Sequence, residues 1–192
     1  MSTSINEIKE RNARSYKLIL LFAMVSMFMM FAGLTSAYIV KRNQSNFLEF
    51  SLPLVFWYST LVILASSLSI QLAVKSFKAR EMSRYRILIT ITAILGVGFA
   101  ALQTMGFMNL ESHGIHLTGP KSNASASFIL IIVGLHALHV LGGVVSLLVM
   151  FLKAYFSSTK NYSSIPIEVV SIYWHFVDIL WLYLLVFFIW IR

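Results

Sequence analysis

Five apolar runs, each about 20 residues long, recur along this chain and are separated by short polar segments. A helix of about that length is what the hydrocarbon core of a bilayer, roughly 30 Å thick, requires. Hydrophobic residues make up 58% of the 192 positions and charged residues only 11%, which is too apolar for a water-soluble domain of this size. The sequence therefore predicts an integral membrane protein.

The runs predict an all-α bundle of five transmembrane helices, at residues 17–40, 52–74, 87–108, 127–152 and 169–191. Strands are excluded because an open sheet in lipid would leave backbone groups without hydrogen bonds. The polar residues 1–16 lack the short basic segment and apolar core of a cleavable signal peptide. They are expected to form a cytoplasmic N-terminal segment ahead of a transmembrane domain at 17–192.

Basic residues are divided unevenly between the two sides of the predicted bundle, and cytoplasmic loops are the ones that retain Lys and Arg. The side of the N-terminus holds Lys9, Arg11, Arg14, Lys17, Lys75, Lys78, Arg80, Arg84, Arg86, Lys153 and Lys160, and the other side holds Lys41, Arg42, Lys121 and Arg192. The N-terminus is therefore expected in the cytoplasm and the C-terminus in the periplasm. This topology, with contact to anionic lipid headgroups, explains the net charge of +8 better than nucleic acid does.

Ionisable side chains lie inside two of the predicted helices. His136 and His139 fall in the fourth helix, and His175 and Asp178 fall in the fifth. With a rise of about 1.5 Å per residue in two antiparallel helices, His139 lies near the depth of His175, and His136 near that of Asp178. Within each helix the two residues are three apart and share a face. The sequence thus predicts a polar layer inside the membrane.

This layer has two interpretations. Two histidines at one depth on neighbouring helices could take both axial positions of a b-type haem. Alternatively Asp178 pairs with His136, because a carboxylate inside a bilayer costs about 2.5–3.5 kcal/mol, and His139 with His175 extends the hydrogen-bonded layer. The stretch "GLHALHVLGG" favours this second interpretation, because small residues allow close helix packing whereas a haem needs space. Its glycines are Gly134, Gly142 and Gly143.

The same residues carry a family resemblance. The stretches "YWHFVDILW" and "GLHALHVLGG" resemble the final two helices of subunit III of the haem-copper terminal oxidases. Further marks of that family follow in its order: "MFAGLTSAYIVKR", the serine pair in "LVILASSLSIQLA", and Gln103 in "GFAALQTMGF". The resemblance spans nearly the whole membrane portion, and five helices match the shorter bacterial form of the family.

The resemblance implies subunit III of a cytochrome c oxidase, or of the related quinol oxidase, in the bacterial inner membrane. Such a chain is part of an enzyme complex but holds no redox centre; haem and copper are expected in partner subunits. Subunits I and II are the expected partners, and phospholipid is expected to be bound. The chain would support proton entry, assembly and durability of the catalytic subunit. His136, His139, Gly142, Gly143, His175 and Asp178 are carried over as structural contacts only.

The five-helix accessory protein of nitric oxide reductase resembles the same family and is the nearest alternative. A transporter is disfavoured, because the chain shows no clear inverted repeat and its three prolines fall at helix ends. The loop residues His113 and His116 have a spacing that could suit a metal. Without a cluster of carboxylates beside them, a solvated external loop is favoured.

The first helix departs from the family pattern. Members commonly carry a Ser-Glu pair there, but in this chain Ser26 is followed by Met27. No proton-related role of that carboxylate is therefore transferred to this protein. The ends of the helices suit lipid headgroups, and the candidates for phospholipid binding are Arg84, Arg86 and Trp57.

Overall fold

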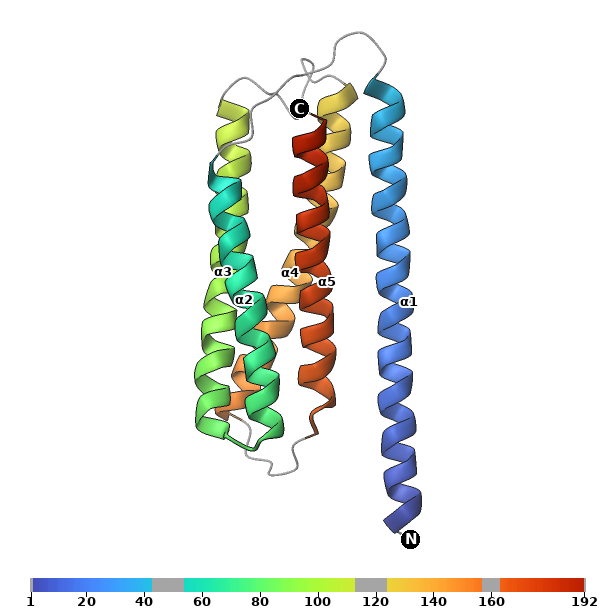
Figure 1. Cartoon of the computed structure of the whole chain (residues 1–192), viewed down its shortest axis with the longest axis vertical. Coiled ribbons are helices and arrows are strands. Elements are labelled where there is room, and N and C mark those ends of the chain that lie inside the picture. The colour runs from blue at the N-terminus through green and yellow to red at the C-terminus, as the bar shows by residue number, and fades with distance from the viewer. Residues whose placement is uncertain (1, 43–53, 113–123, 157–162, 192) are drawn as a thin grey trace.

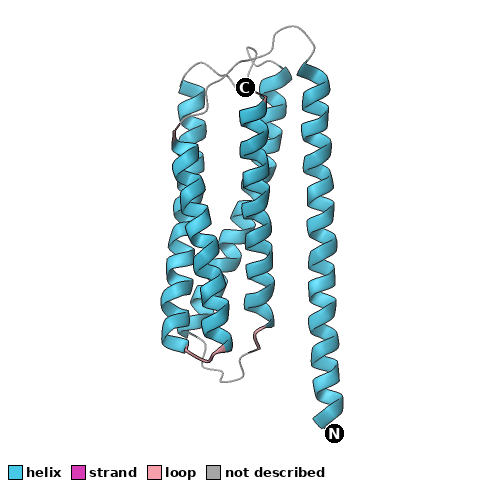
Figure 2. Ribbon diagram, viewed as in Figure 1, coloured by secondary structure: helices cyan, strands magenta, loops and turns pink. Residues whose placement is uncertain are grey.

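The structure is a computed structural model and describes residues 2–42, 54–112, 124–156 and 163–191 (Figure 1). These residues form five helices, α1 (Ser2–Arg42), α2 (Val55–Lys78), α3 (Met82–Ser112), α4 (Ala124–Phe156) and α5 (Ile165–Trp190), with no strand among them (Figure 2). Each helix contains a stretch long and apolar enough to cross a membrane. The predicted all-α fold of five transmembrane helices is confirmed, whereas the orientation of the termini stays a prediction.

Four helices begin earlier than the predicted spans, and the starts of α1 and α5 show why. Helix α1 has 41 residues and continues through most of the polar segment at 1–16, which contains neither glycine nor proline to end it. Helix α5 begins at Ile165 although Pro166 follows directly. Proline is tolerated in the first turn, because its missing N–H would have no partner within the helix there.

Four of the helices form a closed ring. Helix α2 packs against α3, α3 against α4, α4 against α5, and α5 against α2. Helix α1 lies outside this ring and packs only against α4 and α5 (Figure 1). Helix α5 therefore contacts three of the other four helices, and its side chains Trp174, Trp181 and Leu184 are almost fully buried. The core of the protein is built around α5.

The turn between α2 and α3 is short and lacks glycine. Arg80 adopts a left-handed backbone conformation with φ of 62°, which is uncommon for a residue with a side chain. The N–H of Glu81 donates to the carbonyl of Ser76 at 3.0 Å, and that of Arg80 to the carbonyl of Phe77 at 3.1 Å. These two bonds make a Schellman motif, which ends α2 and reverses the chain into α3.

Serines on α2 allow this hairpin to pack tightly. The hydroxyl of Ser69 donates to the carbonyl of Leu88 on α3 at 3.1 Å, and that of Ser66 approaches the carbonyl of Thr92 at 3.4 Å. Small hydroxyl residues let two helix backbones come close in a membrane, where burial in lipid alone would not drive helices together. The serine-rich stretch of α2 is therefore a helix contact surface.

A cluster of charges joins three helices at one end of the bundle. Both oxygens of the Glu168 carboxylate on α5 bind lysines: Lys17 of α1 at 2.6 Å and Lys78 of α2 at 3.1 Å. Glu168 is mostly buried, whereas both lysines are about half exposed. One exposed pair contributes little, but this shared carboxylate fixes α1 and α2 relative to the start of α5.

The indole of Trp174 lies in a notch made by two glycines. A Cβ atom on Gly143 of α4 would lie 2.8 Å from the indole, and one on Gly96 of α3 would lie 3.1 Å from it. Of the other glycines expected to pack helices, Gly142 would place a Cβ 3.5 Å from the hydroxyl of Tyr173. Gly134 has nothing within 4 Å of that position. The closest glycine contact is thus between α4 and α5.

We expect Gly143→Ala to lower the free energy of unfolding by about 1–3 kcal/mol, because the added methyl group would overlap a buried indole that has no room to move. Gly134→Ala is the matched control on the same helix, and there the better helix propensity of alanine adds stability, about 0.5–1 kcal/mol. Thermal unfolding in one detergent compares the two variants. An equal melting temperature for both would contradict the packing of Trp174 against Gly143.

Candidate functional site

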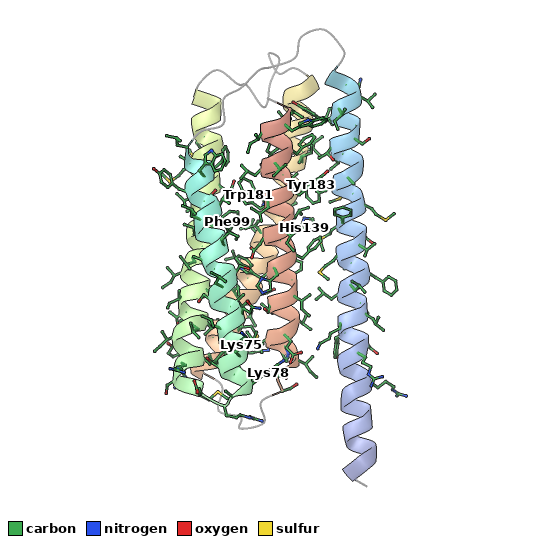
Figure 3. The ribbon with its side chains drawn as sticks, viewed as in Figure 1. Lys75, Lys78, Phe99, His139, Trp181 and Tyr183 are labelled. Atoms are coloured by element: carbon green, nitrogen blue, oxygen red, sulfur yellow. The ribbon has the colours of Figure 1, made fainter. Side chains whose placement is uncertain are left out.

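The four residues of the predicted polar layer all lie in the described part of the chain. His136 and Asp178 are buried, and His139 and His175 are partly buried. Figure 3 shows His139 and Tyr183 on the side of the bundle that faces α1, whereas Trp181 lies toward α2 and α3. The four residues have different neighbours, and their matching depth stays a prediction.

The predicted pair between Asp178 and His136 is not formed. Both carboxylate oxygens of Asp178 and both ring nitrogens of His136 are buried without a hydrogen-bond partner among the described residues. The imidazole of His136 instead stacks on the indole of Trp181, with ring centroids 5.5 Å apart and planes 25° apart. Because Trp181 lies one turn after Asp178 on α5, its large indole takes the place opposite His136. The prediction of this pair was wrong.

His175 contacts α2 rather than α4. Its Nδ1 atom lies 2.6 Å from the hydroxyl oxygen of Ser67 and 3.9 Å from Oδ2 of Asp178. The first distance is a hydrogen bond and the second is not. Ser67 and His175 therefore join α2 to α5 at the level where a contact between α4 and α5 was predicted.

His139 does not extend the layer toward His175. Its Nδ1–H donates to the carbonyl of Leu135 in its own helix at 2.6 Å, and its ring meets the edge of Phe31 on α1, with centroids 6.0 Å apart. Because His139 faces α1 and His175 faces α2, the pair does not fit the two axial positions of one haem. Within the described ranges, no three His, Asp or Glu residues gather closely enough to hold a metal ion.

Hydroxyl groups of α2 bind the polar atoms of the large side chains facing them. The indole N–H of Trp181 donates to the Thr60 hydroxyl at 3.0 Å, and that of Trp174 to the Ser66 hydroxyl at 3.1 Å. Both pairs are buried. The side-chain amide of Gln103 on α3 likewise donates to the Ser59 hydroxyl at 3.0 Å. A buried N–H is costly without a partner, so these bonds fix how α2 and α5 pack.

Sequence reasoning missed these tryptophan–hydroxyl pairs, although a signal for them was present. Trp174 and Trp181 are seven residues apart on α5, and Thr60 and Ser66 are six apart on the antiparallel α2. About two helical turns separate the two tryptophans, and about two turns separate the two hydroxyl residues. Each tryptophan therefore lies at the level of one hydroxyl residue. Gln103 and the serine pair of α2 were noticed only as marks of the family.

Tyrosines connect the outer helix and α4 to α5. The hydroxyls of Tyr183 on α5 and Thr35 on α1 lie 2.7 Å apart, within hydrogen-bond distance. The hydroxyl of Tyr173 donates to the carbonyl of His139 on α4 at 3.0 Å. Aromatic side chains thus supply most polar contacts of α5, because each combines a large apolar body with one hydrogen-bonding group.

The two arginines expected to bind lipid have different surroundings. The Nε–H of Arg86 on α3 donates to the carbonyl of Ala154 on α4 at 2.9 Å, and its guanidinium lies 5.7 Å from the ring centre of Tyr155. Arg84 forms an exposed ion pair with Glu81 at 3.0 Å and faces an open groove of about 320 Å³. The groove is lined by Leu72, Ser76, Arg84, Ile87 and Leu88. Arg86 is thus a helix contact, and Arg84 is the arginine open to a ligand.

Two other described residues singled out by the sequence, Trp57 and Met27, have no part in these contacts. Trp57 is half exposed near the start of α2, at the opposite end from Arg84. Met27 is partly buried on α1. His113 and His116 lie outside the described residues. Neither Trp57 nor Met27 joins the polar contacts between α2 and α5.

We expect Thr60→Val to lower the free energy of unfolding by about 1–3 kcal/mol, because valine keeps the shape but leaves the buried N–H of Trp181 without an acceptor. In Thr104→Val the lost hydroxyl is exposed and binds only its own helix, so a change within about 0.5 kcal/mol is expected. Thermal unfolding of both variants in detergent measures the difference. If the melting temperature of Thr60→Val were no lower than that of Thr104→Val, the hydrogen bond of Trp181 would not contribute to stability.

Comparison with known proteins adds a family match to this geometry. A family model described as cytochrome c oxidase subunit III matches residues 12–192. The chain is 33% identical over 159 residues to a Mycobacterium bovis protein named probable cytochrome c oxidase subunit 3, covering 80% of this chain and 77% of that protein. It is 28% identical over 160 residues to cytochrome c oxidase subunit 3 of Bacillus sp. strain PS3, covering 81% of this chain and 75% of that protein.

Proposed function

The chain belongs to the cytochrome c oxidase subunit III family, and on that premise we propose that it is a non-redox accessory subunit of a bacterial respiratory oxidase. The observation that carries the proposal is the family match over residues 12–192, which includes all five helices except the start of α1. Five membrane-spanning helices make it a multi-pass membrane protein. We place it in the bacterial inner membrane, with its N-terminus in the cytoplasm.

The partners proposed for this chain are the large catalytic subunit I and subunit II. Haem and copper belong to those partners in this proposal, and the complex reduces oxygen with electrons from cytochrome c. Two features of this chain support that division. The three histidines that the structure describes contact serine, tryptophan, phenylalanine or their own helix, and the described residues hold no group of three His, Asp or Glu suited to a metal.

The proposed contribution of the chain is assembly and durability of the catalytic subunit. Its buried polar groups are used mainly to join α2 to α3 and to α5, and Tyr173 joins α4 to α5, which gives a bundle of defined shape. Its outer surface is apolar along every helix and suits acyl chains or neighbouring transmembrane helices. With Met27 at the place of the family glutamate, no proton transfer step is assigned to α1.

We expect this chain, purified in a mild detergent from its native membrane, to be recovered with a large haem-copper oxidase subunit. Mass spectrometry identifies the proteins, and visible spectroscopy of the chain separated from its partners should show no haem. Recovery with nitric oxide reductase would instead identify the chain as the accessory protein of that enzyme. Recovery alone with bound haem would overturn the assignment of the redox centres to partner subunits.

We further propose that the groove beside Arg84 holds an anionic phospholipid. Its guanidinium can bind a phosphate, since Arg84 pairs only with the exposed carboxylate of Glu81. The hydroxyl of Ser76 adds a second polar group, while the other three lining residues offer an aliphatic surface for an acyl chain. Arg80, near this end of the bundle, adds positive charge that attracts anionic headgroups.

Arg84→Ala should reduce the anionic phospholipid that co-purifies by about one molecule per chain, because the variant removes the cation within the groove. Lys75→Ala removes an exposed charge from the same end of the bundle without touching the groove and should leave that number unchanged. Quantitative lipid mass spectrometry of the purified complex compares them. The same lipid content in both variants would count against this site.

A further inference from the structure

One face of α5 is left open by the other helices. Helices α1 and α2 both pack against α5 but do not pack against each other, and Figure 1 shows α5 between them. Three aliphatic side chains at seven-residue intervals, Ile172, Ile179 and Val186, are exposed by 38%, 65% and 64%. His175 lies on the same stripe, between Ile172 and Ile179. We call these four residues the open face of α5.

His175 is an unusual member of such a surface. Its side chain is 33% exposed, and it lies ten residues after the start of α5, which places it about 15 Å along the helix and well inside a membrane. Ionisable side chains in transmembrane helices almost always face the bundle interior or a water-filled cavity. Here the imidazole is partly open on a face whose other members are aliphatic.

The contacts of His175 account for only one of its two ring nitrogens. Nδ1 is bound to the Ser67 hydroxyl at 2.6 Å and lies 3.9 Å from the Asp178 carboxylate. No described residue bonds to Nε2. Ser67 therefore holds Nδ1, and Nε2 of this partly exposed side chain is left without a bond to any described residue.

We propose that the open face of α5 is the docking surface for a transmembrane helix of another subunit, and that this helix carries a hydroxyl or carboxamide side chain that hydrogen-bonds to Nε2 of His175. Either group can donate or accept, so it matches both tautomers of a neutral imidazole. The aliphatic stripe on both sides of His175 supplies the packing surface for that helix.

A partner helix suits this face better than an acyl chain does. An acyl chain would cover Ile179 and Val186 equally well but offers no hydrogen bond to Nε2, which leaves a polar atom unpaired inside the membrane. A hydrogen bond between transmembrane helices adds to their packing and fixes the register in which they dock. The docking surface follows from this geometry, whereas the identity of the partner as an oxidase subunit rests on the proposed function.

The test is photo-crosslinking of the full chain in its native membrane. A photoreactive amino acid replaces Ile179 on the open face, or Ile94 on α3 as the control. The two positions are equally exposed, at 65% and 66%, and lie at similar distances from the starts of their helices. We expect Ile179 to crosslink to another polypeptide that mass spectrometry identifies as a membrane subunit, at a yield at least several-fold above that of Ile94.

A second change tests the hydrogen bond itself. His175→Phe should lower the crosslinking yield at position 179 several-fold, while His175→Gln, whose amide nitrogen replaces Nε2, should restore most of it. Thermal unfolding of the two variants in detergent shows whether the chain itself is equally stable. The proposal fails if position 179 crosslinks only to lipid or to a second copy of this chain, or if His175→Phe leaves the yield unchanged.

The identity of the crosslinked protein separates the two proposals. A haem-copper oxidase subunit at position 179 supports both the docking surface and the proposed function. A subunit of a different complex supports the docking surface and overturns the proposed function. Crosslinking to lipid alone, in a chain that still co-purifies with the oxidase, overturns the docking surface and leaves the proposed function intact.

Discussion

The indole N–H groups of Trp174 and Trp181 bind hydroxyls of α2, and the rest of the bundle is arranged around these two contacts. Inside a membrane no water is present to accept a hydrogen bond from an unpaired N–H. Each large amphipathic side chain therefore needs a partner within the protein. Meeting that need sets the rotation of α5 against α2. The glycine notch of α3 and α4 then receives the indole of Trp174, which brings the remaining two helices of the ring into place.

Helix α1 is attached by fewer contacts than the ring helices. The Tyr183–Thr35 bond, the Phe31–His139 ring contact and the ion pair of Lys17 with Glu168 all reach it from α4 or α5. Because α1 does not contact α2, one face of α5 is left uncovered between them. The position of α1 outside the ring thus creates the surface on which a partner helix could dock.

Polar groups with a partner inside the chain stabilise the bundle, whereas polar groups without one are candidates for a role in function. Serine, threonine, tryptophan and tyrosine are matched in pairs within the chain, as a stable bundle in lipid requires. Asp178, His136 and the outer nitrogen of His175 are not matched among the described residues. Of these residues His175 is partly exposed, and an unmatched polar atom at the surface marks a place where a chain meets something outside itself. An accessory subunit, which performs no chemistry, is expected to keep such unmatched atoms for its neighbours and its lipids.

The sequence by itself determined the five spans, the all-α fold and the family, because hydrophobic length and short motifs are properties of neighbouring residues. It also placed His136, His139, His175 and Asp178 at similar depths, since depth follows from the rise per residue. It did not determine which of them meet. Partner choice depends on the rotation of each helix about its axis, and that rotation is set by how Trp181 and Trp174 pack against other helices. Only the tertiary structure therefore decided that His175 bonds to Ser67 of α2, and that His136 stacks on Trp181 without a hydrogen bond to Asp178.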